Sequence, residues 1–512
     1  MFWPNKKFDF NGLFVLDMAN NHQGSLEHGS RIVREFAAAV REAGVRAGIK
    51  FQFRELNSFI HPDFRESTEN KHIPRFLSTA FSKEDFAILA EEVRNQGLIT
   101  IATPFDEKSV ELAEKLGIEI LKVASCSALD WPLLQRIAES GKPVICSTAN
   151  LPLAEVDKIV SFFDHRGVDY ALAHCVAVYP TPKDKLNLER IKIFRHRYPH
   201  LSIGFSTHES PDDLDAIKVA YASGARFFER HIGVETEDIK LNGYSSRPHQ
   251  IPGWFEAWKE AVKMLNLKNA EDDLEEKESL ESLMRGVYFR DNIMAGEKIG
   301  RERVFFAMPL LPGQLKSGQW KDDLTADRDY FAGQPAPASI KPDIFSQRDV
   351  IYQTIRTVKG MLNMARIFPN YDSSVEISHH YGLENFFAVG AVIIDCINRE
   401  YCKKLIIVLP GQSHPYHYHK KKEETFQVLS GQMEVELEGK KRIVYPGDTV
   451  LVPRGIWHSF FTNEGVIFEE ISTTHFNNDS FYADKSIDKL PREARKTKLI
   501  NWGRHQFDEL KN

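Results

Sequence analysis

Cysteine is scarce in this chain of 512 residues. The five cysteines, at positions 126, 146, 175, 396 and 402, are odd in number and form no Cys-x-x-Cys motif. A disulfide framework normally uses an even number of cysteines. We therefore expect reduced thiols, as in a cytoplasm.

Long apolar runs are absent too, and so is an excess of positive charge. No stretch approaches the ~18 consecutive apolar residues that a membrane span requires. The first ten residues, MFWPNKKFDF, lack the apolar core of a secretion signal. The net charge of −6 offers no basic field for nucleic acid. These absences predict a cytoplasmic protein that contacts neither a membrane nor nucleic acid.

The composition is otherwise that of an ordinary globular protein, 42% hydrophobic and 27% charged, and the length suggests about three domains. In the first half, apolar strand-like runs alternate with amphipathic helical runs, which is typical of a parallel sheet covered on both faces. About eight such units in ~250 residues predict an α/β fold, the (β/α)8 barrel. We expect strands near 14–19, 48–53, 100–105, 120–125, 143–148, 170–178, 202–208 and 226–232. We expect helices near 31–43, 83–96, 107–116, 131–139, 155–163, 188–197, 212–222 and 252–265.

Polar residues follow the predicted strands where each strand ends, at the face on which barrel enzymes carry their sites. His208 and His231 end the seventh and eighth strands, where two neutral imidazoles can hold a divalent metal with open positions. Lys50 and Lys122 lie near the ends of the second and fourth strands, where a buried ammonium group needs an anion or a carboxylate. The other strand-end candidates are Asp17, Asn20, Asn21, His22, Gln52, Thr103, Ser125, Ser147, Thr148, Tyr179 and Ser206. This pattern predicts a pocket for an anion and a metal; the alternatives are a structural ion pair for the lysines and satisfied histidines at the strand ends.

Eight short motifs occur in a fixed order between residues 20 and 233. They are NNHQGS at 20–25, KFQ at 50–52, ATPFDEKSV at 102–110, LKVAS at 121–125, GKPVICSTA at 141–149, HCVAVYPTP at 174–182, GFSTHES at 204–210 and ERHIG at 229–233. Together they resemble the sialic acid (N-acetylneuraminate) synthase family. Members of that family condense phosphoenolpyruvate with a sugar aldehyde to give a 3-deoxy-2-ulosonic acid and phosphate. The resemblance implies the same reaction type here, in carbohydrate biosynthesis.

The resemblance also implies roles for individual residues. Phosphoenolpyruvate would be bound by Lys50, Thr103, Lys122, Ser125, Ser147 and Ser206. His208 and His231 would bind Mn²⁺ or Mg²⁺, which polarises the acceptor aldehyde. Tyr179 and Gln52 would face the acceptor sugar. The two lysines would offset the carboxylate and phosphate charges.

Departures from the family pattern fall mostly on the acceptor side. Asp17 replaces a glutamate on the first strand, Ser127 replaces an acidic residue, and Ala177 replaces an asparagine. The aspartate expected after the eighth strand is replaced near Asn242. We therefore expect an acceptor other than N-acetylmannosamine. Asp17 is predicted to handle a proton or bind a sugar hydroxyl, or alternatively to cap residues 20–21.

A smaller domain is predicted after the barrel. Residues 269–279, NAEDDLEEKES, predict an exposed acidic linker. The segments SLMRGVYFRDNIMAGEKIGRERV and LTADRDYFAGQPAP then resemble the antifreeze-like (SAF) domain that follows the barrel in this family. The resemblance implies a homodimer in which this domain caps the barrel of the partner and inserts an arginine towards the acceptor. Met308 stands where that arginine would fall.

The last part of the chain has short alternating strands with Gly and Pro turns from about residue 375 to 483, typical of a β-barrel or sandwich. A helix near 348–367 is predicted to lead into it. GQSHPYHYHKKKEETFQVLSG at 411–431 and GDTVLVPRGIWHSFF at 447–461 resemble the two cupin motifs. His417 and His419 share one strand face, and with Glu424 and His458 they form a predicted site for Mn, Fe, Ni or Zn.

Two further segments, SHHYG at 378–382 and EISTTHFNNDSFY at 470–482, make the region similar to the D-lyxose isomerase type of cupin. The lysines at 420–422 are interpreted as a solvated basic edge or a contact for a sugar anion. Three domains are thus predicted: a barrel synthase at 1–268, a SAF domain at 283–342 and a cupin at 370–490. The cupin either isomerises or epimerises the sugar that the barrel uses, or only binds sugar or dimerises. A barrel without synthase activity is disfavoured because both histidines and both lysines are retained.

Overall fold

The computed structural model describes residues 8–266, 273–322, 324–340, 346–370, 373–476 and 478–502. The chain forms two compact units, Met1–Asn269 and Ala270–Asn512, and each is described by itself. Within the described ranges, the structure contains no helix with the length and apolar character needed to cross a membrane.

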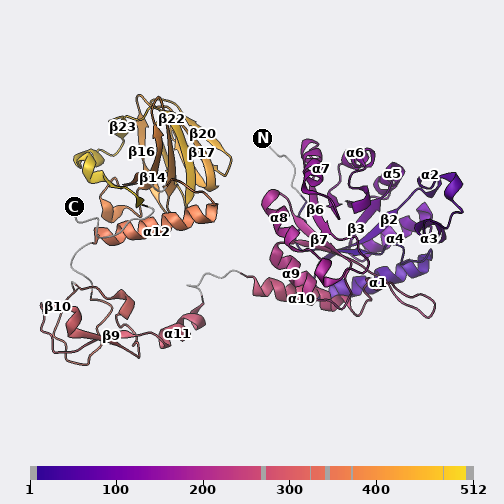
Figure 1. The fold of residues 1–512 in the computed structure, drawn as a ribbon, viewed down its shortest axis with the longest axis horizontal. Coiled ribbons are helices and arrows are strands. Elements are labelled where there is room, and N and C mark those ends of the chain that lie inside the picture. Colours follow the sequence, from indigo (N-terminus) through magenta and orange to yellow (C-terminus); the bar gives the residue numbers. More distant parts are fainter. Residues whose placement is uncertain are drawn as a thin grey trace. The chain divides into compact units, whose positions relative to one another are not determined.

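The first unit is a closed barrel of eight parallel strands that pair in sequence order, with β8 returning to β1 (Figure 1). The strands are β1 Leu13–Asp17, β2 Arg46–Phe53, β3 Ile99–Pro104, β4 Ile120–Val123, β5 Val144–Ser147, β6 Tyr170–Cys175, β7 Ile203–Thr207 and β8 Phe227–His231. Nearly all of their residues are buried, as parallel strands covered on both faces require. The predicted (β/α)8 barrel is confirmed.

Eight helices follow the strands and surround the barrel (Figure 1). They are α1 Leu26–Ala43, α4 Lys83–Asn95, α5 Glu107–Lys115, α6 Trp131–Glu139, α7 Leu153–His165, α8 Glu189–Arg197, α9 Asp215–Ser223 and α10 Ile251–Met264. Helix α1 illustrates the sequence logic: Ile32, Phe36 and Val40 repeat every four residues and are buried. Ser25 caps its first turn, and Gly44, with φ of 63°, ends it in the left-handed conformation.

The inward faces of the strands change from apolar to polar along the barrel axis. Val15, Ile101, Ile145 and Phe227 belong to one buried apolar cluster. Side chains two residues further along a strand share the same face. That step places Asp17, Thr103, Ser147 and Glu229 above this apolar layer, at the carboxyl ends of β1, β3, β5 and β8. The barrel therefore presents a polar floor at the face where its sites are expected.

An insertion between β2 and α4 was not predicted. It contains α2 Leu56–Phe59, a 3₁₀ turn Pro62–Phe64 and α3 His72–Ser78. Phe59 and Phe64 of this insertion are exposed. It starts at the carboxyl end of β2 and therefore begins at the same face as the polar floor.

The second unit begins with α11 Leu274–Ser282. The second part of the predicted exposed acidic linker 269–279 falls on this helix, which Asp273 caps by accepting from the backbone N–H of Glu276. The first part, up to residue 272, lies outside the described residues. The helix has no buried residue, so the exposure that the acidic composition suggested is observed. The small strands β9 Gly286–Phe289, β10 Lys298–Ile299, β11 Val304–Ala307 and β12 Leu324–Thr325 follow, around a small core of their own.

The last region is a two-sheet β structure. One sheet has the order β20-β17-β22-β15-β14-β13-β24, and the other has the order β19-β18-β21-β16-β23. The strands are β13 Val375–Ser378, β14 Ala391–Asn398, β15 Tyr401–Val408, β16 Ser413–His419, β17 Glu424–Gly431, β18 Met433–Leu437, β19 Lys440–Val444, β20 Thr449–Val452, β21 His458–Phe461, β22 Val466–Thr473, β23 Ser480–Tyr482 and β24 Lys496–Leu499. The predicted cupin fold class, a β-barrel of short strands, agrees with this arrangement.

Helix α12 Gln347–Ala365 is part of this fold, and not only a lead into it as predicted. Its residues Ile355, Val358 and Leu362 are buried in one cluster with Ile377 of β13. At the other end, β24 pairs with β13. The folded region therefore extends on both sides of 370–490, while the boundaries of the three domains stay predictions.

Candidate active site and metal centre

Four charged side chains form a buried chain on the floor of the barrel. Lys50 Nζ lies 2.9 Å from Asp17 Oδ2 and 2.7 Å from Glu229 Oε1. The same Glu229 oxygen lies 2.7 Å from Lys122 Nζ. Gln52 Nε2 donates to Asp17 Oδ2 at 3.3 Å. Two cations and two carboxylates thus converge from β1, β2, β4 and β8, and each buried charge has a partner.

These contacts set the protonation states. Burial raises the pKa of Asp17, but Lys50, His231 and Lys122 outweigh it, so the pKa lies well below its usual value. Burial also raises the pKa of Glu229, and Lys122 and Lys50 reverse the shift. The pKa of Lys50 is raised, because Asp17 and Glu229 overcome its burial, whereas burial keeps the pKa of Lys122 below its ordinary value. The floor is therefore ionised, and Lys122 holds its proton less tightly than Lys50.

The two predicted metal histidines lie beside each other at this floor. The rings of His208 and His231 have centroids 5.3 Å apart. His208 Nδ1 lies 3.0 Å from the carbonyl oxygen of Val176, so Nδ1 can donate there while Nε2 stays open as a ligand. Burial and the neighbouring imidazole of His231 lower the pKa of His208 to about 3. His208 is therefore neutral near pH 7, as metal binding requires.

Aromatic rings enclose this pair. The Tyr179 ring lies 4.2 Å from the His208 ring, and the Tyr244 ring lies 5.2 Å from the His231 ring. Tyr179 and Tyr244 also lie near each other, with centroids 5.4 Å apart. The two histidines and the two tyrosines therefore form one aromatic cluster at the carboxyl ends of β7 and β8.

The four predicted hydroxyl ligands are also placed near the floor. Thr103, Ser147 and Ser206 are buried at the ends of β3, β5 and β7. The side-chain oxygens of Thr103 and Ser147 have no hydrogen-bond partner among the described residues. Ser125 Oγ accepts the backbone N–H of Ala149 at 3.1 Å. A buried hydroxyl without a partner is costly, so a polar ligand is the natural complement of this site.

Two predicted acceptor-side residues have mainly local contacts. Ser127 is buried in a 3₁₀ turn, and its hydroxyl lies 3.9 Å from the Cys126 sulfur. Asn242 Oδ1 accepts the backbone N–H of Tyr244 at 3.1 Å. Asn242 thereby positions the loop that carries Tyr244 against the histidines. Asp17 Oδ1 accepts the backbone N–H of Ala19 at 2.9 Å, so the predicted capping role is present beside its ion pair.

Sequence reasoning missed Glu229 and Tyr244. Glu229 was quoted within the ERHIG motif, but only His231 was assigned a role. The signal was present, because two residues separate Glu229 from His231 on one strand, so both point inward, and two buried lysines demand a carboxylate. Tyr244 lies in a loop without regular structure, and no periodicity marks it.

The cupin residues converge as the spacing predicted. His417, His419 and His458 are buried, and one ring nitrogen from each lies within 4.8 Å of the others. Their Nδ1 atoms lie 2.9, 2.7 and 3.1 Å from backbone carbonyl oxygens, which assigns the proton to Nδ1 and leaves Nε2 as a ligand. Glu424 lies 3.4 Å from His419 Nε2 and 3.2 Å from His458 Nε2. Three imidazoles and a carboxylate suit a transition metal.

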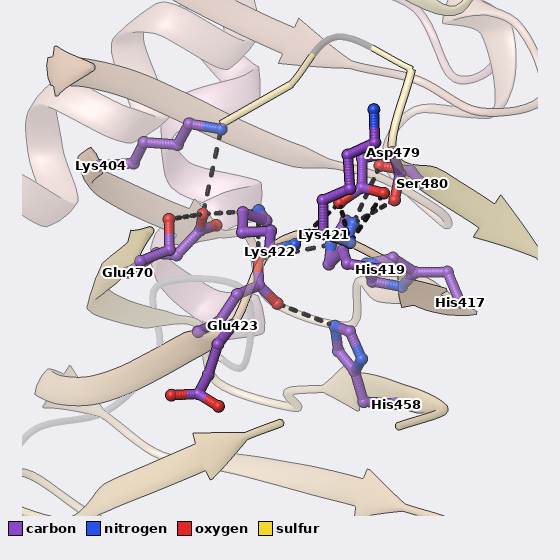
Figure 2. Close-up of polar contacts among 12 residues, drawn as sticks. Lys404, His417, His419, Lys421, Lys422, Glu423, His458, Glu470, Asp479 and Ser480 are labelled. Carbon is purple, nitrogen blue, oxygen red and sulfur yellow. Dashed lines mark hydrogen bonds and ion pairs between the residues drawn. The ribbon is translucent and has the colours of Figure 1, made fainter. Parts of the chain in front are cut away.

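The lysine run beside this site is not simply a solvated edge. Lys420 and Lys421 are exposed, but Lys422 is buried. Lys422 Nζ pairs with Glu424 and lies 2.8 Å from Glu470 Oε1 (Figure 2). The solvated interpretation is wrong for Lys422 because period 2 in the following strand turns it inward with Glu424, where carboxylates offset its burial.

The four predicted metal ligands line a cavity of about 430 Å³, which is large enough for a monosaccharide. Lys404, Lys422 and Glu470 line it too, together with His380 and His414. The Nε2 atoms of the last two are 3.2 Å apart. The cavity therefore combines a predicted set of metal ligands, an ion pair and polar groups suited to sugar hydroxyls.

A family model described as the NeuB family matches residues 36–265. A solved structure from Chromobacterium violaceum, a provisionally named spore coat polysaccharide biosynthesis protein E, is 43% identical, with a TM-score of 0.62 over 65% of this chain and 100% of that chain. The chain belongs to the NeuB family. This NeuB-family chain is also 29% identical to N-acetylneuraminate-9-phosphate synthase of Drosophila melanogaster over 266 residues, covering 50% of this chain and 68% of that protein.

A longer match extends over more residues than the barrel contains. An uncharacterised protein, MJ1065, of Methanocaldococcus jannaschii is 28% identical over 323 residues, which is 59% of this chain and 90% of that protein. A model described as the cupin domain matches residues 404–468, which include all four predicted cupin ligands. The predicted resemblance to the sialic acid synthase family and to cupins is confirmed.

Proposed function

We propose that this NeuB-family chain condenses phosphoenolpyruvate with a sugar aldehyde, giving a 3-deoxy-2-ulosonic acid and phosphate. The observation that carries the proposal is the floor of the barrel, which holds two buried lysines and two buried hydroxyls without partners among the described residues. An anion with a carboxylate and a phosphate supplies acceptors for both sets of donors. The relative named as an N-acetylneuraminate-9-phosphate synthase supports the reaction class.

The reaction forms one carbon–carbon bond and releases one phosphate. Carbon 3 of phosphoenolpyruvate attacks the aldehyde carbon, water adds at carbon 2, and the bond between carbon 2 and the phosphate oxygen breaks. Lys50 and Lys122 offset the negative charge of substrate and leaving phosphate in a partly dry site. Asp17 and Glu229 hold both ammonium groups in place before substrate binds. Thr103, Ser125, Ser147 and Ser206 donate hydrogen bonds to the phosphoenolpyruvate oxygens.

A divalent metal, Mn²⁺ or Mg²⁺, completes the barrel site in this proposal. His208 and His231 fit it because burial keeps both imidazoles neutral, with the pKa of each lowered. When bound, the metal polarises the acceptor aldehyde. Gln52, Tyr179, Ser127 and Asn242 belong to the acceptor side. Cytoplasmic location and a homodimer with a capping SAF domain stay predictions, as does the exposed Met308 at the place of the family arginine.

The test is phosphate release from phosphoenolpyruvate with Mn²⁺ or Mg²⁺ and a panel of aldoses, ketoses and their N-acetyl and phosphorylated forms. We expect release with one sugar class and its loss in His208→Ala. His165→Ala is the matched control, because His165 is exposed at the end of α7, remote from the carboxyl face. Equal rates of phosphate release in both variants would refute the proposal, and so would the absence of release with every sugar.

A second activity is favoured by the cupin cavity. Lys422 and Glu470 form a buried ion pair beside the Glu424 carboxylate and line the cavity. Proton transfer between the first two carbons of a sugar needs an acid or base positioned near a metal that holds the sugar oxygens. We propose that the cupin isomerises or epimerises the sugar for the barrel, with Mn, Fe, Ni or Zn held by His417, His419, Glu424 and His458.

Mass spectrometry and NMR of ketose and aldose pools separate this activity from sugar binding or dimerisation alone. The double variant His417→Ala with His419→Ala is expected to abolish interconversion and to leave aldose use by the barrel intact. If the wild type shows no interconversion and the double variant loses sugar binding, the cupin is a binding module. An unchanged sugar pool and unchanged binding would leave dimerisation as its role.

A further inference from the structure

A row of three polar side chains leads from the barrel floor to the insertion between β2 and α4. Lys50 and Gln52 lie in β2, and Arg54 follows the last residue of that strand. Residues two apart along an extended chain share a face. The guanidinium of Arg54 also contacts a side chain of α3. Side-chain contacts therefore connect the floor to the insertion.

Two aromatic rings hold the guanidinium of Arg54. Its central carbon lies 3.7 Å from the centroid of the Phe105 ring and 4.0 Å from that of the Phe76 ring, which belongs to α3. A planar guanidinium stacks on aromatic faces better than the compact ammonium group of a lysine does. Arg54 Nε is buried without a hydrogen-bond partner among the described residues. The two rings therefore determine where the guanidinium points.

The guanidinium in turn determines which way the Gln52 amide faces. Arg54 Nη2 donates to Gln52 Oε1 at 3.1 Å, and Gln52 Nε2 donates to Asp17 Oδ2 at 3.3 Å. An arginine offers only donors, and an ionised carboxylate offers only acceptors. Turning the amide over would place donor against donor at Arg54 and acceptor against acceptor at Asp17. Both neighbours thus select the same orientation.

This orientation bears on Asp17 at the floor. Asp17 Oδ2 also lies 2.9 Å from Lys50 Nζ and 3.4 Å from His231 Nε2. Unlike an ammonium group, an amide can present either a donor or an acceptor to this oxygen. The amide nitrogen carries two hydrogens, so the orientation that Arg54 selects offers one N–H to Asp17 and the other to a ligand.

We propose that Arg54 is a positioning residue of the synthase. It acts through Gln52, whose amide it orients towards Asp17, and α3 holds it there through Phe76. The inference rests on the proposed synthase function, in which Gln52 belongs to the acceptor side. The role of the insertion is then to support a group that meets the acceptor sugar.

A double-mutant cycle separates action through Gln52 from a merely structural role. We measure kcat and KM for both substrates in Arg54→Leu, in Gln52→Ala and in the double variant, with the sugar class that supports phosphate release. We expect Arg54→Leu to lower kcat/KM for the acceptor about tenfold, as loss of a charge-assisted hydrogen bond does, and to leave the KM for phosphoenolpyruvate unchanged. In the Gln52→Ala background the same change should have no further effect, because the amide that Arg54 orients is gone.

A loss of the same size in the Gln52→Ala background overturns the inference, as does an unchanged kcat/KM in Arg54→Leu. Arg54→Lys keeps a donor but stacks less well, so its kcat/KM should lie between those of the wild type and the leucine variant. It also covers the case of a leucine variant that does not fold. Phe76→Leu should reproduce part of the Arg54→Leu effect, again only when Gln52 is present. Arg65→Leu is the matched control, because Arg65 is an exposed arginine of the same insertion that donates to Asn57.

A measurement without turnover keeps this test independent of the synthase proposal. NMR of the full chain with isotope-labelled glutamine detects the side-chain amide of Gln52, which is identified by its loss in Gln52→Ala. Its signal should shift in Arg54→Leu and stay in place in Arg65→Leu. An unchanged signal in Arg54→Leu overturns the inference. A shifted signal without turnover of any sugar refutes the synthase and still supports the orienting contact.

Discussion

At the scale of single residues, Glu229 controls the charge of the floor. Its carboxylate stabilises the protonated forms of both Lys50 and Lys122. This effect matters more for Lys122, because burial already lowers the pKa of that lysine. Glu229→Gln removes one partner of a buried ion pair, which costs about 3–5 kcal/mol. We expect the alkaline limb of kcat/KM for phosphoenolpyruvate to shift to lower pH, since Lys122 then loses its proton earlier.

The control for this prediction is Glu209→Gln. Glu209 pairs with Arg230 at 2.6 Å and is equally buried, so a similar loss of stability is expected. Its pH profile should match that of the wild type, measured at protein concentrations and temperatures where both variants are folded. Identical profiles for the two glutamine variants would show that Glu229 only holds the barrel together.

The buried side chain of His22 is expected to make the stability of the fold fall in acid. It stacks on Phe81 at 3.9 Å, and its folded pKa is about 4, below the unfolded value of 6.5. Above pH 6.5 both states are neutral, and between pH 6.5 and 4 only the unfolded state takes up the proton. Stability therefore falls as the pH drops, by about 2 kcal/mol for this residue at pH 5. Urea unfolding at pH 7.5, 6 and 5 measures the slope, and His22→Asn should reduce it; an equal slope contradicts the assignment.

Residue positions were predictable where a strand ends, because period 2 and the barrel topology fix which side chains point inward. Lys50, Lys122, His208 and His231 were found in this way. The pairing of Glu229 with two lysines required the register of four strands, which a single sequence does not display. Lys422 was predicted to be solvated because a run of three lysines is typical of an exposed surface. Only the direction of the following strand shows that its side chain points inward.

At the scale of elements, the loop that carries Asp479 supports the cupin ligands. Its carboxylate accepts the backbone N–H groups of Lys420, Lys421 and Lys422 at 2.9–3.1 Å. Its carbonyl oxygen lies 2.7 Å from His419 Nδ1. Asp479 thus connects the loop before β23 to the turn between β16 and β17 (Figure 2).

Asp479→Ala is expected to weaken metal binding about 10- to 100-fold, as loss of outer hydrogen bonds typically does. Asp479→Asn keeps one acceptor oxygen and should lie between the alanine variant and the wild type. Metal affinity is measured by competition with a chelator. Asp448→Ala is the control, since Asp448 accepts one backbone N–H in another turn. Unchanged affinity in Asp479→Ala would mean that the backbone alone positions His419.

The elements that the sequence did not predict are those without a strong period. The insertion with α2 and α3 has short helices and exposed aromatics. Helix α11 has no buried face, so only the Asp273 cap and good helix formers indicate it. The eight barrel units were predictable because each buries a continuous apolar strand and one apolar helix stripe.

At the scale of the whole molecule, the two units have separate cores, so a core change should act on one of them. Val358 of α12 is fully buried in the cupin cluster. We expect Val358→Ala to destabilise that cluster by about 1–3 kcal/mol and to leave the barrel unaffected. Differential scanning calorimetry of the full chain should resolve one transition that moves in this variant and another that does not. A single transition shifting as one would contradict separate cores.

The pairing of β24 with β13 has a consequence for how such a protein can arise. The strand that opens the cupin after α12 and the strand that closes it are hydrogen-bonded neighbours, and Trp502 packs in the same cluster as α12. Entry and exit of the chain thus meet at one edge, as in segments that tolerate insertion and permutation. A recombination event could therefore add this region after another enzyme, or remove it, without interrupting a strand.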